Sequence, residues 1–132
     1  MRKSLLCLLL CLLQGISFAS KSRLTGTATF YAKAHIGHRT TSGERYNPNE
    51  LTAAHATLPI NSYVQVHNLK NGRTVLVRIN DRMSRNSRYV IDVSRKAAQT
   101  LGIIGAGMGK VKLVVVSKEE ALAQIKKVDK AA

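Results

Sequence analysis

The clearest structural signal in this 132-residue chain is YVQVHNLKNGRTVLVRI, residues 63–79. Apolar and polar residues alternate over residues 63–67 and again over residues 74–79, which is the period of a β-strand with one buried face. The pair Asn71-Gly72 lies between the two segments and is a strong signal for a tight hairpin turn. The sequence therefore predicts an antiparallel β-hairpin near the middle of the chain.

Shorter segments of the same kind flank this hairpin. We expect further strands at residues 25–31, 51–54, 89–93 and 111–116. Ser94 has the position of an N-cap for a helix over residues 95–101 that ends at Gly102. Ser117 can open a second short helix, and the tail from Lys126 is expected to fray.

Five or six short strands with one or two short helices indicate a small, mainly β fold, either a barrel or a sandwich. The core is expected to be aliphatic, since the chain has no Trp and few other aromatic residues. The residues expected in it are Val64, Val66, Val75, Val77, Ile79, Ile91, Val114 and Val116.

The first 19 residues have the features of a secretory signal peptide. The cationic start Arg2-Lys3 precedes an apolar run at residues 5–13, and Ser17-Phe18-Ala19 is a small-x-small cleavage site. We expect cleavage after Ala19 and export to the periplasm or cell envelope. The apolar run is too short for a retained membrane span. A lipid anchor is the alternative, but Cys7 and Cys11 lack the small preceding residue of a lipobox.

Residues 20–132 are expected to form one monomeric domain, with a core at about residues 25–116 and a short polar C-terminal tail. Cleavage would remove both cysteines, so the domain would have no disulfide and no thiolate metal site. The formal charge of +14 would fall to +12 with the loss of Arg2 and Lys3. Such a cation binds anionic polymers readily. Export favours cell-wall glycan over nucleic acid as the partner, although the charge could also serve solubility alone.

All seven carboxylates of the chain lie in residues 20–132. Those with an ordinary explanation in turns, caps, loops or the polar tail are Glu50, Asp92, Glu119, Glu120 and Asp129. Glu44 lies in a long loop at residues 33–50, and Asp81 follows an apolar strand beside Arg82, where a carboxyl pKa can be shifted. A turn, or an ion pair with Arg78 or Arg82, would explain Asp81 equally well.

Other kinds of chemistry have weaker support. The histidines His35, His38, His55 and His67 do not have the spacing of a zinc site, and we expect no metal and no cofactor. The chain has no Gly-x-Ser-x-Gly nucleophile motif and no phosphate-binding glycine loop. The kind of chemistry that these exclusions leave is catalysis by one carboxylic acid, or by two carboxylates, on a neutral sugar polymer.

Several motifs together resemble the rare lipoprotein A (RlpA) family of septal ring lytic transglycosylases. They are TTSGERY (40–46), LTAAHATLP (51–59), VHNLKNGR (66–73), VRINDR (77–82) and IDVS (91–94). The resemblance spans about residues 25–116 and implies a six-stranded double-psi β-barrel, akin to that of expansins. It implies catalytic carboxylates at Glu44 and Asp81 and an active-site histidine at His55.

The resemblance also implies a function. It is endolytic cleavage of the MurNAc–GlcNAc β-1,4 bonds of peptidoglycan, with formation of a 1,6-anhydroMurNAc end, in wall remodelling or septation. Asp81 would be the general acid and base, Glu44 its partner in cation stabilisation or proton relay, and His55 an orienting group. Substrate-binding residues expected along the groove are Tyr31, Asn80 and Arg82. The implied partners are peptidoglycan glycan strands and, at the septum, cell-division proteins.

The sequence departs from the family pattern at two places. The family's Trp-Tyr is Phe30-Tyr31 here, and its NDRGP turn is replaced by residues 80–84, NDRMS. We also expect no SPOR domain, which in many relatives binds denuded glycan. Two alternatives stay open: a non-catalytic, expansin-like module that binds or loosens the wall, and a basic periplasmic interaction protein that uses Arg82, Arg85 and Arg88. Release of anhydro products would distinguish the enzyme from both.

Overall fold

The computed structural model describes residues 24–132, and the predicted signal peptide with its cleavage site lies outside them. The elements, in chain order, are β1 (Leu24–Phe30), the 3-10 helix η1 (Lys33–His35), β2 (Thr52–His55), β3 (Tyr63–Asn68), β4 (Thr74–Arg82), β5 (Ile91–Val93), α1 (Arg95–Leu101), β6 (Gly109–Val116) and α2 (Lys118–Ala131).

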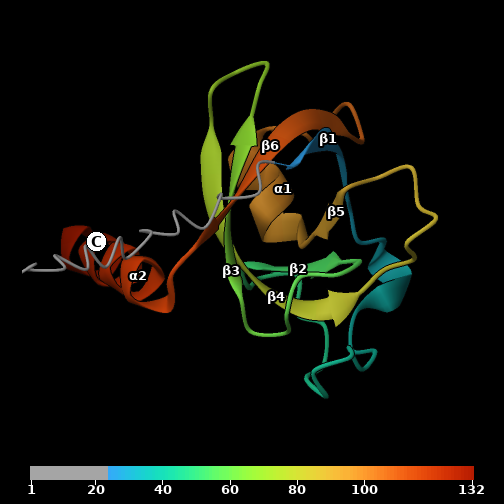
Figure 1. The fold of residues 1–132 in the computed structure, drawn as a ribbon, viewed down its shortest axis with the longest axis horizontal. Coiled ribbons are helices and arrows are strands. Elements are labelled where there is room, and N and C mark those ends of the chain that lie inside the picture. The colour runs from blue at the N-terminus through green and yellow to red at the C-terminus, as the bar shows by residue number, and fades with distance from the viewer. Residues whose placement is uncertain (1–23) are drawn as a thin grey trace, which may run out of the picture.

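The six strands close into a barrel in the order β1-β5-β2-β4-β3-β6 (Figure 1). β3 and β4 form the predicted antiparallel hairpin, in which Val66 lies opposite Val75. β6 closes the barrel by pairing antiparallel with both β3 and β1. The β1–β5 and β2–β4 pairings are parallel, so the chain crosses over between strands instead of forming a simple meander. The prediction of a mainly β, six-stranded barrel with two helices is confirmed.

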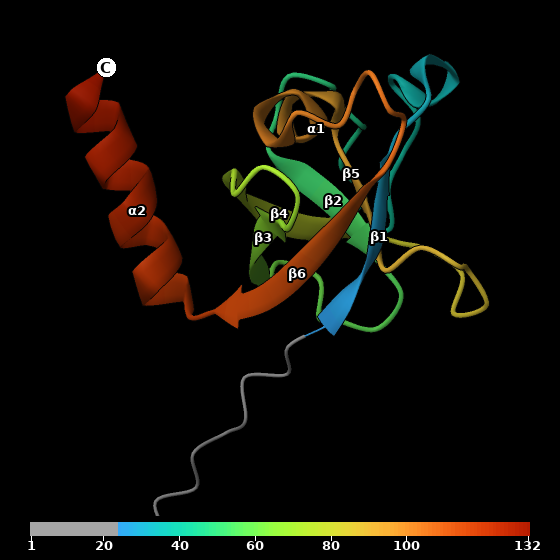
Figure 2. The ribbon, with the colours of Figure 1, turned by 90° about the horizontal axis from the view of Figure 1, so that it is seen from above.

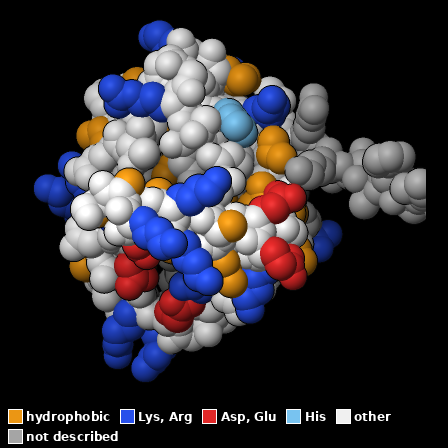
Figure 3. Space-filling view, turned by 90° about the vertical axis from the view of Figure 1, so that its left-hand side faces the viewer, with side chains coloured by type: hydrophobic (Ala, Val, Ile, Leu, Met, Phe, Trp, Pro, Cys, Tyr) orange, Lys and Arg blue, Asp and Glu red, His pale blue; other side chains and the backbone are white. Residues whose placement is uncertain are grey.

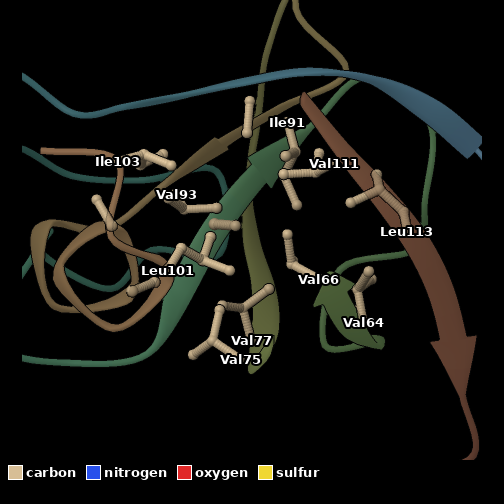
Figure 4. Close-up of a cluster of buried hydrophobic side chains, with 14 of the residues drawn as sticks. Val64, Val66, Val75, Val77, Ile91, Val93, Leu101, Ile103, Val111 and Leu113 are labelled. Atoms are coloured by element: carbon tan, nitrogen blue, oxygen red, sulfur yellow. The ribbon is translucent and has the colours of Figure 1, made fainter. Parts of the chain in front are cut away.

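The barrel interior is filled by aliphatic side chains (Figure 4). In β3 and β4, Val64, Val66, Val75 and Val77 alternate with more exposed residues, as the sequence pattern predicts. Leu101 of α1 packs into the same cluster.

The inward face of β6 was predicted wrongly. Val111 and Leu113 are buried, whereas Val114 and Val116 lie partly exposed. Residues 113–116 are continuously apolar and show no alternation, but Lys110 and Lys112 alternate with Val111 and Leu113 and so indicate the face that the structure buries. The register with β1 and β3 places the same face inward.

The helix α1 forms at the predicted residues and helps to close the barrel. The Ser94 hydroxyl accepts a hydrogen bond from the Ala97 N–H, and Gly102 ends the helix in the left-handed conformation (φ 73°). Ala97 and Ala98 are fully buried, and the helix packs against β4 and β1.

The helix α2 is longer than predicted. Residues from Lys126 to Ala131 are helical, so the expectation of a short helix with a frayed tail is wrong. Ser117 caps the first turn, which carries Glu119 and Glu120, and Lys130 lies in the last turn, so charges at both ends complement the helix dipole. None of the helices in residues 24–132 is both long and apolar enough to cross a membrane.

The helix α2 lies to one side of the barrel, at the end of β6 (Figures 1 and 2). Among the charged side chains on this face of the molecule, Lys and Arg are more widespread than Asp and Glu (Figure 3). A cleft of about 540 Å³ separates the helix from the barrel, with Ile125 and Val128 on one wall and Tyr63, Leu76 and Arg78 on the other.

Truncation of a barrel core residue tests this packing. Val77 is 0% exposed, and Val77→Ala should lower the free energy of unfolding by about 1–3 kcal/mol, because it removes buried methyl groups and leaves a cavity. Val114→Ala is the matched control and should cost less, since Val114 is only partly buried. Urea denaturation of both variants measures the difference. Equal losses would contradict the inward face described above.

Candidate active site

The long loop between β1 and β2 folds onto the end of β4 (Figure 1). Its tip is a tight turn in which the Thr40 N–H donates to the Glu44 carbonyl at 2.8 Å, with Gly43 at φ 89°. The Ser42 N–H donates to the Asn80 carbonyl at 3.0 Å, which fastens the turn to β4. Asn80 was predicted to line the groove. The structure leaves it only 3% exposed and gives its backbone this anchoring contact.

The strand β4 continues through Arg82, three residues beyond its predicted end at Ile79. Asp81 therefore lies within a strand and not in a turn after it. The parallel partner β2 causes the extension, because Ala54 pairs with Asp81 and His55 pairs with Arg82. A position within a paired strand holds the Asp81 carboxylate more rigidly than a turn would.

The carboxylate of Asp81 accepts four hydrogen bonds. The Tyr31 hydroxyl donates to Oδ2 at 2.5 Å, and the Thr41 N–H, the Thr41 hydroxyl and the Arg82 N–H each donate to Oδ1 at 2.9 Å. Burial acts to raise the pKa of Asp81, but these donors together hold it below its usual value. The Tyr31 ring stacks on Tyr46 at 4.3 Å, which fixes the phenol. Asp81 is thus an ionised, tightly held carboxylate.

Glu44 is bound to Arg78 in a bidentate ion pair. Both guanidinium–carboxylate distances are 2.7 Å, and the Ser42 hydroxyl donates to the same carboxylate at 3.0 Å. Arg78 is the main cause of the lowered pKa of Glu44. The sequence suggested Arg78 only as an ion-pair partner of Asp81. The structure pairs it with Glu44, so the pair ties the loop to β4.

His55 and Arg82 support the turn that follows β2. His55 is 4% exposed, and its Nδ1 accepts hydrogen bonds from the N–H groups of Thr57 (3.1 Å) and Leu58 (3.0 Å). Burial, with a smaller effect of Arg82, lowers the pKa of His55, so the ring is neutral and carries its proton on Nε2. The Arg82 guanidinium donates to the carbonyls of His55 and Leu58. In residues 24–132 no hydrogen bond joins His55 to Asp81.

Asp92 has a different environment from the one predicted. It was expected to serve a turn or cap at the end of the strand predicted at residues 89–93, but it lies in the middle of β5, paired with Ala54 of β2 and Thr29 of β1. The helix cap is made by the hydroxyl of Ser94 itself. The Asp92 Oδ1 atom is buried and has no hydrogen-bond partner among residues 24–132. Burial, together with the charge of Asp81, raises the pKa of Asp92 to about 6.

Residues 23–113 match a protein-family model described as Lytic transglycolase. The chain belongs to this family. An endolytic peptidoglycan transglycosylase RlpA from Pasteurella multocida is 52% identical over 91 residues, which are 69% of this chain and 31% of the relative. The RlpA of Neisseria meningitidis serogroup A is 51% identical over 89 residues, 67% of this chain and 37% of the relative. The chain therefore spans about a third of the length of these curated relatives.

Solved structures support the double-psi form of this lytic transglycolase barrel. The Streptomyces papain inhibitor superposes with a TM-score of 0.58 at 23% identity, covering 72% of this chain and 94% of the inhibitor. An expansin of Clavibacter michiganensis also gives 0.58, at 20% identity, covering 73% of this chain and 51% of the expansin. At such identities the likeness concerns the fold alone. The prediction of an RlpA-like double-psi β-barrel is confirmed.

In this lytic transglycolase domain, the loop and β4 bring Tyr31, Glu44 and Asp81 to one end of the barrel. Sequence reasoning did not single out Thr41 or Asp92. Thr41 belongs to the TTSGERY motif, and its place in that motif was the feature of the sequence that could have identified it as a site residue. For residues 24–132 no group of three His, Asp or Glu side chains lies close enough to hold a metal ion.

The phenol hydrogen bond from Tyr31 stabilises the charged form of Asp81. Tyr31→Phe removes this bond and should therefore raise the pKa of Asp81. The depressed pKa gives stability that is present above the unfolded-state pKa and is lost as pH falls through the folded-state pKa. The variant should therefore have a lower free energy of unfolding at neutral pH than the wild type, and this free energy should fall less as the pH is lowered. Carboxyl-carbon NMR titration measures the shift, with Tyr89→Phe as control, since Tyr89 contacts only Arg88 through its hydroxyl. An unchanged Asp81 midpoint would contradict the assignment.

Proposed function

We propose that this protein is an endolytic peptidoglycan lytic transglycosylase that cleaves MurNAc–GlcNAc β-1,4 bonds and forms 1,6-anhydroMurNAc ends. The single observation that carries the proposal is the Asp81 carboxylate, ionised and held by four hydrogen bonds at the end of the barrel. The names of the relatives from Pasteurella and Neisseria support the same reaction. The family membership of residues 23–113 supports it as well.

In the proposed reaction, Asp81 is the catalytic base. Its carboxylate accepts the proton of the MurNAc C6 hydroxyl while the C6 oxygen attacks C1 of the same sugar, and the glycosidic oxygen leaves with a proton. Asp81 was expected to serve as both acid and base. The four donors favour the base half of that role, since they stabilise the charged form. A placed proton-transfer group contributes about 10²–10⁴-fold to a rate.

The other predicted site residues support Asp81 in this proposal. Tyr31 holds the carboxylate and lies where it can also contact the sugar. Glu44 acts through Arg78 to position the loop that presents Thr41, which bonds Asp81. His55 and Arg82 shape the turn that borders the site, and Asn80 anchors the loop.

The charge of the chain fits a substrate with free carboxylates. The formal charge is +14, and peptidoglycan carries lactyl or peptide carboxylates along its glycan strands. We propose that the protein acts in the periplasm or cell envelope after export. Association with cell-division proteins is part of the same proposal.

Mass spectrometry of purified sacculi tests the activity. Incubation with the protein should release muropeptides or glycans that end in 1,6-anhydroMurNAc, and a parallel digestion with amidase-treated sacculi shows whether denuded strands are preferred. Binding to sacculi without any anhydro product would favour the expansin-like module. Neither binding nor cleavage would favour the basic interaction protein.

A further inference from the structure

Asp92 and Asp81 lie in one row across three strands. Asp92 of β5 pairs with Ala54 of β2, and Ala54 pairs with Asp81 of β4 after a shift in the β2–β4 register between Ala53 and Ala54. The charge of Asp81 acts on Asp92, which agrees with their closeness. Residues paired across neighbouring strands point to the same face of a sheet. The two carboxyl groups therefore share a face, about two strand spacings or 10 Å apart at their Cα atoms. The methyl side chain of Ala54 is the only one between them in this row, so it leaves room for the two groups to converge.

The surroundings of the two carboxyl groups are opposite in kind. Asp81 has four donors, whereas Asp92 has a buried Oδ1 without a partner. A buried carboxylate oxygen that lacks a donor favours the neutral, protonated acid. The residue as a whole is partly exposed, although Oδ1 is buried.

The groups around Asp92 reinforce this difference. Asp92 is faced by Asp81 from β4, by Tyr31 from the end of β1 and by Tyr46 from the loop. On the β2 side its paired neighbour is Ala54, which has no titratable group. Arg95, at the start of α1, is close enough to act on Tyr46. Asp81 is the negative charge nearest to Asp92 among these groups and opposes its ionisation. Burial and the charge of Asp81 raise the pKa of Asp92 to about 6, close to neutral pH, which suits a proton donor.

We propose that Asp92 is the general acid of the reaction and gives its proton to the glycosidic oxygen, while Asp81 is the base. This assignment rests on the proposed lytic transglycosylase activity. The Asp92 O–H proton passes to the oxygen as the MurNAc C1–O bond breaks, and GlcNAc leaves with a free 4-hydroxyl. The MurNAc C6 oxygen forms the new bond to C1, and its proton passes to Asp81. No water is consumed, and exchange with solvent returns a proton to Asp92 and removes one from Asp81.

Two substrates with different leaving groups test the assignment. On glycan strands, Asp92→Asn should lower the rate of anhydro product release about 100-fold or more. On a glycan oligomer that ends in a 4-nitrophenyl β-MurNAc glycoside, the leaving group needs no proton. Asp92→Asn should therefore react at nearly the wild-type rate on this substrate, whereas Asp81→Asn should stay impaired. Asp129→Asn on α2 is the matched control and should match wild type on both substrates.

Carboxyl-carbon NMR titration of the wild-type protein gives a readout that does not depend on activity or on the folding of a variant. The Asp92 midpoint should lie near 6, and Asp81→Asn should lower it by removing the neighbouring charge. An active wild type with Asp92→Asn unchanged on glycan, or an Asp92 midpoint in the ordinary range, overturns the role of Asp92 alone. A wild type that releases no anhydro product from any glycan overturns the proposed function, and the acid role with it.

Discussion

The Asp81→Asn variant is expected to lose glycan cleavage by about 10²–10⁴-fold while keeping its fold and its binding to glycan. The amide is nearly isosteric with the carboxylate, so the barrel and the loop should still form. It cannot take the proton of the C6 hydroxyl. Release of anhydro-ended products, followed by mass spectrometry, measures the rate, and circular dichroism with a sacculus pull-down measures fold and binding.

Glu50→Gln is the control for Asp81→Asn. The Glu50 side chain is exposed, and its hydrogen bond to the Asn47 amide is long at 3.5 Å, so the variant should cleave at the wild-type rate. If Asp81 only stabilises the fold, its replacement lowers the melting temperature and leaves the turnover of folded protein intact. Wild-type turnover by folded Asp81→Asn would remove this residue from the mechanism.

Loss of the Glu44–Arg78 pair is expected to have the second largest effect. Arg78→Met removes both 2.7 Å hydrogen bonds to Glu44 and so loosens the turn that presents Thr41 to Asp81. The turn keeps its backbone bond from Ser42 to Asn80. Small displacements of positioning groups can cost about 10²-fold in rate, so a loss of this order is expected for both Arg78→Met and Glu44→Gln.

A double-mutant cycle separates positioning from chemistry at Glu44. If Glu44 acts through Arg78, the double variant should be no slower than either single variant, because the same contact is lost in each. If Glu44 takes part directly, Glu44→Gln should be much slower than Arg78→Met, and the effects should add. Arg73→Met, at the exposed hairpin turn, is the matched control and should retain wild-type rate.

The elements with strong local signals could be predicted from the sequence. The hairpin of β3 and β4 and the helix α1 lie where alternation, Asn-Gly, the Ser94 cap and Gly102 place them. The end of β4 could not be predicted in this way, because it depends on the register with β2, which is distant in sequence and which local patterns do not contain. The inward face of β6 was predictable, because Lys110 and Lys112 alternate with Val111 and Leu113.

The candidate site was predictable to a similar extent. Elimination among seven carboxylates retained Glu44 and Asp81, which the loop and β4 do bring to one end of the barrel. Asp92 was set aside because a carboxylate near the end of a strand, two residues before Ser94, suggests a turn or a cap. Its single buried oxygen results from the closeness of β1 and β2 on both sides of β5, which only the closed barrel creates.

The pairings between strands that are distant in sequence have a consequence for how the protein folds. Leu24 at the start of β1 pairs with Leu113 in β6, and β5 must insert between β1 and β2 before Asp92 lies in line with Asp81. Folds rich in such long-range pairings have high contact order and form slowly. The two carboxyl groups therefore lie apart until β5, β2 and β4 have paired, so the proposed acid–base pair exists only in the folded barrel.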